Sequence, residues 1–143
     1  MYKKILVALE NGPADESLLP HVMELAKKFG SEILLLHVAD GWVARSFDQL
    51  KLAESEEMKE DRDYLEKAAV RLRREGLSVA TLLALGNPPT EIRKVAEAKH
   101  CDLIAMGSHG HRLLGDLFHG STITDVRHKT LIPMLVVRAK TKK

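Results

Sequence analysis

Five short apolar runs alternate along this chain with longer segments in which apolar residues recur at helical spacing. The runs are Ile5–Leu9, Ile33–Val38, Leu77–Leu85, Leu103–Met106 and Pro133–Val137. Most are apolar at consecutive positions, which is typical of strands in a parallel sheet that helices cover on both faces. Strand–helix units joined by right-handed crossovers give an open, doubly wound sheet. We therefore predict an α/β protein whose ligand binds past the carboxyl ends of the strands.

The ends of the intervening helices can be predicted from capping residues. Asn87 is the predicted N-cap of the helix after the third apolar run. In the first helix, Gly30 follows the last apolar position and is the predicted stop. Ser17 is the predicted N-cap of that helix, because Pro20 is tolerated only within a first turn. Residues Glu54–Glu75 have helical spacing, and the charge run Glu54–Asp63 within them is interpreted as a solvated helix face.

Composition excludes several classes of protein. A length of 143 residues suits a single domain over residues 1–143, with 140–143 as a polar tail. No apolar run approaches the roughly 20 residues of a membrane span. The formal net charge is only +2, whereas binding to nucleic acid is dominated by a large excess of positive charge. Cys101 is the single cysteine and suits a reducing compartment. We expect a cytoplasmic protein that binds neither membranes nor nucleic acid.

The loop after the fourth apolar run carries the features of an anion site. Gly107 and Gly110 follow a buried strand, and glycine lets the backbone approach a ligand closely or adopt a positive φ. Gly120, Ser121 and Thr122 open a helix, where free N–H groups and the positive end of the dipole attract phosphate. The loop is neither a Walker A loop nor a dinucleotide fingerprint. From the residues alone, a phosphate site and an ordinary glycine-rich loop both stay open.

The spacing Gly107-x2-Gly110-x9-Gly120-Ser121 resembles the nucleotide-binding signature of the universal stress protein (UspA) family. Five further segments match that family in register, so the resemblance covers nearly the whole chain. They are Lys3–Ala8, Leu35–Val38, Gly86–Pro88, Cys101–Gly107 and Pro133–Val137.

The resemblance implies a Rossmann-like, five-stranded parallel sheet in the order 3-2-1-4-5, with helices on both faces. It also implies a homodimer paired through Pro133–Val137 and ATP held at the switch point of the sheet. A nucleotide-borne Mg²⁺ or Mn²⁺ fits the same interpretation, because Mg²⁺ commonly binds through phosphates and water. The implied site residues are Ala8 and Glu10 beside the nucleoside, the Val38 backbone at adenine, and Gly107, His109, Gly110, Gly120, Ser121 and Thr122 around ribose and phosphates.

This chain departs from the family pattern at two positions. The family usually has Asp where this chain has Glu10, and often Ser or Thr where it has Gly12. The extra methylene of Glu10 can reach a ribose hydroxyl or can crowd it, and both outcomes stay open.

The histidines do not make a convincing metal site. His109, His111 and His119 lie near one another in sequence, but no cysteine or carboxylate cluster joins them to complete three or four ligands. His37, inside an apolar strand, is interpreted as a buried histidine with its hydrogen bonds satisfied. Cys101 is interpreted as a small packed residue.

The sequence shows no recognisable set of catalytic residues. Phosphoryl transfer needs bound metal ions and a positioned nucleophile, and no motif in the sequence indicates either. We expect an ATP-binding switch or interaction module of the stress response, with at most slow ATP hydrolysis. Two alternatives remain. One is a weak ATPase or a nucleotidyl-transfer relative. The other is a dimeric interaction module that binds no nucleotide, which Glu10 favours because a displaced carboxylate there would close the nucleoside pocket.

Overall fold

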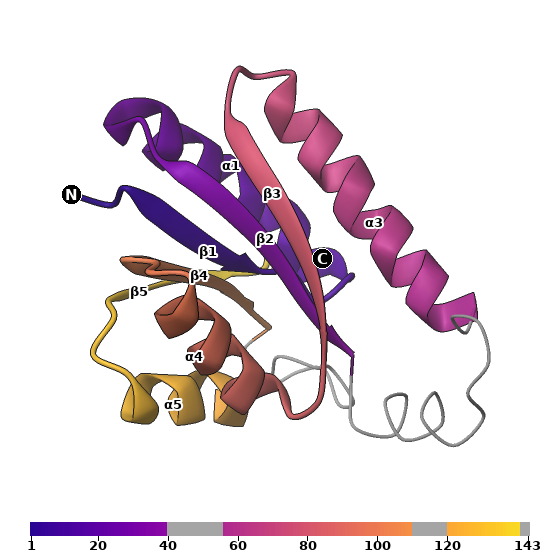
Figure 1. Ribbon diagram of the computed structural model, residues 1–143, viewed down its shortest axis with the longest axis vertical. Helices are drawn as coiled ribbons and strands as arrows, with labels where there is room; N and C mark the ends of the chain where they lie inside the picture. The colour runs from indigo at the N-terminus through magenta and orange to yellow at the C-terminus, as the bar shows by residue number, and fades with distance from the viewer. Residues whose placement is uncertain (40–55, 110–119, 141–143) are drawn as a thin grey trace.

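The computed structural model describes residues 1–39, 56–109 and 120–140, and its helices and strands alternate along the chain (Figure 1). In order they are β1 (Lys4–Ala8), α1 (Pro13–Phe29), β2 (Glu32–Ala39), α3 (Glu56–Arg73), β3 (Ser78–Leu85), α4 (Pro88–Ala98), β4 (Leu103–Ser108), α5 (Gly120–Lys129) and β5 (Met134–Arg138). The strands form one five-stranded sheet in the order β3-β2-β1-β4-β5, and every pairing is parallel. The predicted fold class and strand order are confirmed.

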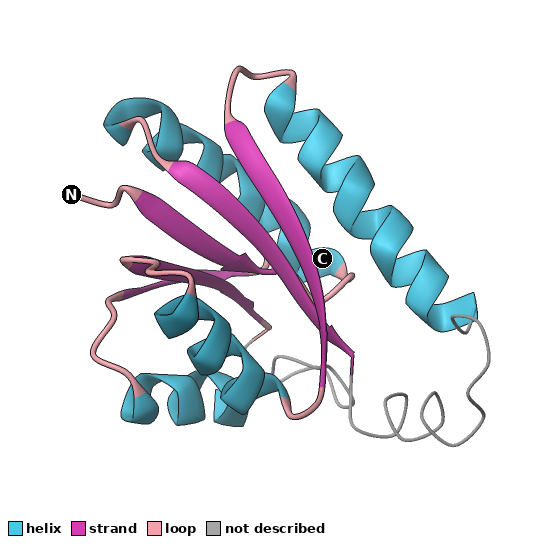
Figure 2. Ribbon diagram, in the orientation of Figure 1, coloured by secondary structure: helices cyan, strands magenta, loops and turns pink. Residues whose placement is uncertain are grey.

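Helices cover both faces of the sheet (Figure 2). Alternate residues of β1 point to opposite faces: Ile5 and Val7 pack into the core beneath α1 and α3, whereas Leu6 and Ala8 pack into the core beneath α4 and α5. This two-sided burial is the physical reason why the strands are apolar at consecutive positions.

The central strand β1 locates the switch point of the sheet. It pairs with β2 on one side and β4 on the other, so that Ala8 lies opposite both Leu36 and Met106. The chain builds outward from β1 to β3 and then crosses back to β4 and β5. In sheets of this kind the crevice for a ligand opens where the strand order reverses, here between the carboxyl ends of β1 and β4.

The beginning of α1 corrects a prediction. Gly12 is the N-cap and Pro13 the first helical residue, so Ser17 as N-cap is wrong. Pro20 lies inside the helix, where it removes the hydrogen bond to the carbonyl of Glu16. Both residues are exposed, so water can hydrate that carbonyl. The Ser17 hydroxyl instead accepts a hydrogen bond from the Lys140 backbone N–H, at 3.0 Å.

The other predicted caps are confirmed. Gly30 ends α1 in the left-handed region, with φ of 67°. Asn87 caps α4, because its side-chain oxygen accepts from the Thr90 backbone N–H at 3.2 Å. Cys101 is buried in the core beneath α4 and α5, as expected of a packed residue. No helix among the described residues combines the length and apolarity needed to cross a bilayer.

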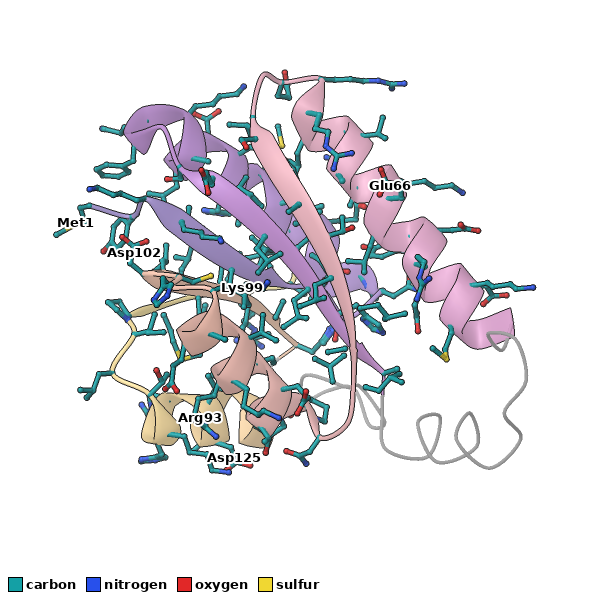
Figure 3. All side chains as sticks on the ribbon, viewed as in Figure 1. Met1, Glu66, Arg93, Lys99, Asp102 and Asp125 are labelled. Carbon is teal, nitrogen blue, oxygen red and sulfur yellow. The ribbon has the colours of Figure 1, made fainter. Side chains whose placement is uncertain are left out.

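Asp102 ties the beginning of β4 to the beginning of β1, close to the amino terminus (Figure 3). Its carboxylate accepts hydrogen bonds from the backbone N–H groups of Lys3 (2.9 Å) and Lys4 (3.0 Å). Slight burial acts to raise the pKa of Asp102, but the hydrogen bonds from Lys4 and Lys3 outweigh it and hold the pKa below its usual value of 3.8.

We expect Asp102→Asn to lower the free energy of unfolding by about 1 kcal/mol at pH 7, because the charge-assisted hydrogen bonds are weakened at a partly exposed site. The folded pKa is depressed, so this contribution is present above the unfolded pKa and is lost as pH falls from 3.8 through the folded pKa. Urea unfolding at pH 7, 5 and 3 measures the difference from the wild type. A difference that stays constant down to pH 3, or that the exposed Asp63→Asn variant reproduces, would contradict this role.

Candidate functional site

The carboxyl ends of β1, β2 and β4 bring together most of the predicted site residues that the structure describes. Ala8 is the last residue of β1, Val38 lies one residue before the end of β2, and Gly107 lies one residue before the end of β4. His109 follows β4 directly, and Glu10 lies two residues after the end of β1, so both lie in the loops beyond the sheet. These five residues therefore lie around the switch point of the sheet.

The beginning of α5 supplies the remaining described residues, Gly120, Ser121 and Thr122. The helix leads to the amino end of β5, so it runs opposite to the strands and begins at their carboxyl side. The Thr122 residue is 4% exposed. Gly110, together with His111 and His119, lies outside the described residues. A helix beginning at Gly120, as predicted, presents its first N–H groups and its positive dipole end at this edge of the sheet.

The side chains of Glu10 and His109 form a buried contact across the switch point. The Glu10 Oε1 atom contacts the His109 Nε2 atom, and both side chains are only 4% exposed. The pair joins the loop after β1 to the loop after β4. A carboxylate and an imidazole out of contact with water interact strongly, because little solvent screens them.

Gly107 packs so closely against α1 that a residue with a side chain would not fit at this position. A Cβ atom placed on it would lie 2.8 Å from the Cβ of Ala14 and 3.2 Å from the Ala14 carbonyl oxygen. Gly107 is part of β4 and is not among the glycines with positive φ. Of the two possibilities that glycine offers at this position, a positive φ is not used. Glycine instead allows close packing of α1 on β4, and that packing sets where the site's loops begin.

Asp15 organises the loop between β1 and α1. Its carboxylate accepts from the backbone N–H groups of Glu10 (3.2 Å), Asn11 (3.0 Å) and Gly12 (3.4 Å). The Tyr64 hydroxyl on α3 donates to the same carboxylate at 2.6 Å. Burial raises the pKa of Asp15, and the hydrogen bonds from Tyr64 and the three amides act against that rise. Burial, together with the hydrogen bond to Asp15, also raises the pKa of Tyr64.

His37 joins the same loop to α3 by a second route. Its Nδ1 atom donates to the Leu9 carbonyl oxygen at 2.7 Å, and its Nε2 atom lies 3.3 Å from Asp61 Oδ2. The Asn11 side-chain amide donates to Asp61 Oδ1 at 3.1 Å. His37 is thus buried with both ring nitrogens engaged, which confirms its interpretation from sequence.

Asp15, Asp61 and Tyr64 were not predicted as site residues. Asp61 belongs to the charge run interpreted as a solvated face, yet it is 7% exposed, so that interpretation is wrong at this position. Asp61 and Tyr64 stand three residues apart and therefore share one face of α3. Asp15 stands three residues after the N-cap, where an acidic side chain commonly reaches back to backbone N–H groups. Those spacings were the available signals.

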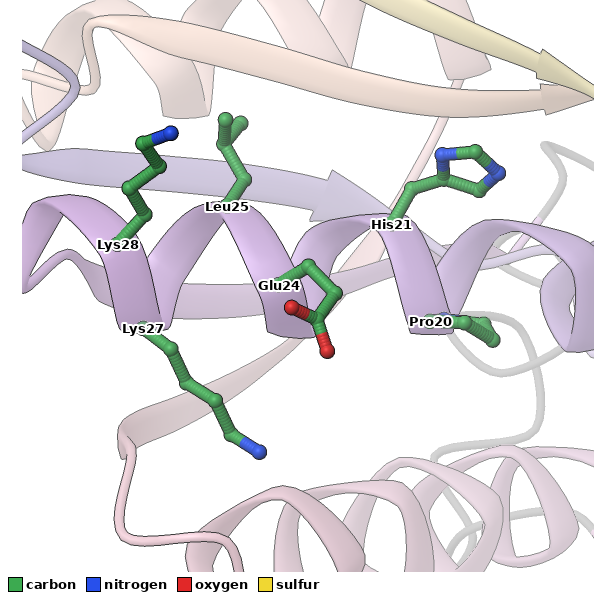
Figure 4. A pocket seen from close by; sticks show the side chains of 6 residues that line it. All are labelled: Pro20, His21, Glu24, Leu25, Lys27 and Lys28. Atoms are coloured by element: carbon green, nitrogen blue, oxygen red, sulfur yellow. The ribbon is translucent and has the colours of Figure 1, made fainter.

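Two other kinds of site that the described residues could form are a cluster of metal ligands and a surface hollow. Among the described residues, no three histidine, cysteine or acidic side chains gather as metal ligands. A shallow hollow over α1 is lined by residues of that helix alone (Figure 4). Its lining residues are Pro20, His21, Glu24, Leu25, Lys27 and Lys28. None of them is a predicted site residue.

Comparison with known proteins gives consistent matches over nearly the whole chain. The model of the universal stress protein family matches residues 1–138. Universal stress protein MJ0577 of Methanocaldococcus jannaschii is 31% identical over 160 residues, which cover 98% of this chain and 97% of the relative. The solved structure of MJ0577 is similar with a TM-score of 0.82 and 32% identity, covering 99% of both chains.

Two more distant structures share the fold and hold nucleotides. A universal stress protein from Archaeoglobus fulgidus, solved in complex with dAMP, has a TM-score of 0.71 and 23% identity over 95% of this chain and 98% of that one. A further universal stress protein, solved in complex with cAMP, has a TM-score of 0.70 and 16% identity over 97% and 98%.

Proposed function

The chain belongs to the universal stress protein family, and on that premise we propose that it binds an adenine nucleotide, foremost ATP, at the switch point of its sheet. We further propose that it acts as a single-domain, cytoplasmic, nucleotide-dependent switch or interaction module in the stress response. The observation that carries the proposal is the meeting of three strand ends, β1, β2 and β4, with the beginning of α5 at one edge of the sheet.

The donor set at that edge fits a phosphorylated ligand. The first turn of α5 offers backbone N–H groups whose partners within the helix are missing, and Ser121 and Thr122 carry hydroxyls. The helix dipole adds a favourable field for negative charge. A divalent ion carried by the nucleotide, Mg²⁺ or Mn²⁺, would neutralise the phosphates further.

The end of β2 fits the proposed adenine contact. The Leu36 carbonyl accepts from the Leu9 N–H at 2.8 Å, so the backbone groups of Leu36 face β1. Directions alternate along a strand, so those of Val38, two residues on, face the same side. The paired register of β1 with β2 ends at Ala8 opposite Leu36. The Val38 backbone therefore faces the side of β2 beyond the last paired residue of β1, which is where we propose that the edge of the adenine base binds.

We expect ATP with Mg²⁺ to stabilise the protein against heat. At 100 times Kd a ligand that binds only the folded state contributes about 2.7 kcal/mol, or roughly 10 °C in Tm for a domain of this size. Calorimetric titration and thermal unfolding with ATP, ADP and AMP measure affinity and preference. Gly110→Val is expected to abolish binding while leaving the unliganded Tm largely unchanged. An absence of both heat and thermal shift in the wild type would refute the proposal.

We also propose a homodimer paired through β5. This strand lies at one edge of the sheet with β4 as its neighbour, and Val136 on it is 44% exposed. An edge strand with exposed apolar side chains is suited to pairing with a second copy around a twofold axis.

We expect Val136→Lys to convert the dimer to a monomer, because a buried charge at the centre of the interface would be left without a partner. Native mass spectrometry and light scattering measure the subunit number. Val70→Lys on α3 is the matched control, since Val70 is also an exposed valine, and it should leave the dimer intact. A monomeric wild type would contradict the proposed interface.

The buried Glu10–His109 pair favours one alternative, an interaction module that binds no nucleotide, because the carboxylate is already engaged within the protein. Native mass spectrometry of the purified protein separates the two, since a co-purified nucleotide would exclude that alternative. A weak ATPase is tested by steady-state phosphate release: turnover above about 1 s⁻¹, the lower end of usual enzyme rates, would favour it.

A further inference from the structure

The side chain of Glu10 bends across the switch point. Its Oε1 atom contacts His109, as described above, and its other oxygen, Oε2, is buried from solvent. The side chain as a whole is 4% exposed. A ligand at the carboxyl ends of β1 and β4 would therefore meet a carboxylate that is turned into the protein.

Gly12 makes room for this arrangement. A Cβ atom placed on Gly12 would lie 3.2 Å from Glu10 Oε1 and 3.4 Å from its Cδ and Cγ atoms. Contacts at 3.2 Å are tighter than ordinary van der Waals packing, so a side chain at position 12 would require the Glu10 carboxylate to shift by a few tenths of an ångström. Glu10 and Gly12 are thus physically coupled: the Glu10 side chain takes up this position without a close contact because its neighbour has no side chain.

His109 holds the carboxylate in this position. To turn its carboxylate toward a sugar hydroxyl, Glu10 would have to move its Oε1 atom away from a contact with His109 that is buried from water. A hydroxyl is a poor replacement for an imidazole there, because hydrogen bonds to charged partners are the stronger ones. The contact with His109 therefore keeps the Glu10 carboxylate away from the ligand. Without that acceptor, the site has no means at this position of distinguishing ribose from deoxyribose.

We propose that Glu10, Gly12 and His109 together make the site indifferent to the sugar 2′-hydroxyl, so that it takes ribonucleotides and 2′-deoxyribonucleotides with similar affinity. This inference rests on the proposed nucleotide binding. It assigns Glu10 and His109 as specificity-determining residues that act by holding each other.

The test compares ATP with 2′-deoxy-ATP by calorimetric titration of the wild-type protein. We expect the two dissociation constants to differ by less than fivefold. If the Glu10 carboxylate accepted a bond from the 2′-hydroxyl, loss of that bond to a charged group would weaken binding by about tenfold or more. A wild-type preference for ATP of fivefold or more would overturn the inference while supporting the proposed function. Binding of neither nucleotide would refute the proposed function, and this inference with it.

Two variants sharpen the test. Glu10→Gln keeps the shape of the side chain and removes its charge, and we expect the ratio of the two affinities to stay within twofold of the wild type. His109→Ala removes the hydrogen-bond donor and so releases the carboxylate, and we expect a preference for ATP of fivefold or more to emerge. A selective loss of ATP affinity in Glu10→Gln, or an unchanged ratio in His109→Ala, would contradict the role of the pair. If His109→Ala binds neither nucleotide, the wild-type ratio and the Glu10→Gln ratio test the inference. Thermal unfolding without nucleotide confirms that each variant is folded.

Discussion

Asp15→Ala is expected to lower the free energy of unfolding by about 3 kcal/mol, which corresponds to a fall in Tm of roughly 10 °C. The substitution leaves the Tyr64 hydroxyl and the N–H groups of Glu10, Asn11 and Gly12 without their common acceptor. Donors that lose their partner in a buried place cost about 1–3 kcal/mol each, and water can replace part of that at the exposed end of the loop. Thermal and urea unfolding measure the change.

A graded series tests the cause. Asp15→Asn keeps one acceptor oxygen and should cost less than Asp15→Ala, and Tyr64→Phe, which removes a single donor, should cost about 1 kcal/mol. Glu16→Ala is the matched control, because its carboxylate forms an exposed pair with Arg71 at 3.5 Å, and its effect should stay within about 0.5 kcal/mol. Equal losses in Asp15→Ala and Glu16→Ala would show that the buried network does not support the loop.

The pH dependence of this effect runs opposite to that of Asp102. Burial raises the folded pKa of Asp15 above its unfolded value of 3.8. As pH falls through the folded pKa, the folded state binds a proton before the unfolded state does, so the wild type gains stability that the alanine variant cannot gain. We therefore expect the deficit of Asp15→Ala to widen between neutral pH and about pH 4. A deficit that shrinks over that range would contradict the direction of the pKa shift.

Strand positions could be predicted from sequence because the sheet is buried on both faces. A strand such as β1, whose successive buried side chains enter two different cores, must be apolar at consecutive buried positions, and such runs are easily recognised. Helix caps could also be predicted, because the residues that form them are close together in the sequence. Asn87 and Thr90 lie three residues apart, and Gly30 directly ends its helix.

Contacts between distant segments could not be predicted. The beginning of α1 was misplaced because Pro20 argues locally against a helix that passes through it, whereas the actual N-terminus is stabilised by Asp15 together with Tyr64, which lies 49 residues further along. The Glu10–His109 pair joins residues 99 apart in the sequence. The family resemblance implied that both of these residues lie at the ligand site, but only the fold shows that they contact each other.

Gly107→Ala is the second substitution for which we expect a large effect. The added Cβ would lie 2.8 Å from the Cβ of Ala14, and the next nearest atoms are backbone atoms of Ala14, so no flexible side chain can move aside. The helix α1 must shift away from β4, and overpacking of this kind costs about 1–3 kcal/mol. Because Asp15 follows Ala14 directly, the shift also displaces the loop that Asp15 holds, and we expect the affinity for ATP to fall by tenfold or more.

The double variant Ala14→Gly/Gly107→Ala separates this clash from other causes. Ala14→Gly alone should destabilise the first turn of α1 by up to about 1 kcal/mol, since glycine is a poor helix former. In the pair, removal of the Ala14 Cβ gives the new methyl group space, so the double variant should be more stable than the sum of the single effects predicts, by at least about 1 kcal/mol. ATP affinity should recover in parallel, because α1 can return toward β4. Strictly additive losses in urea unfolding, with no recovery of ATP binding, would mean that the contact between Gly107 and Ala14 does not set the position of the loop after β1.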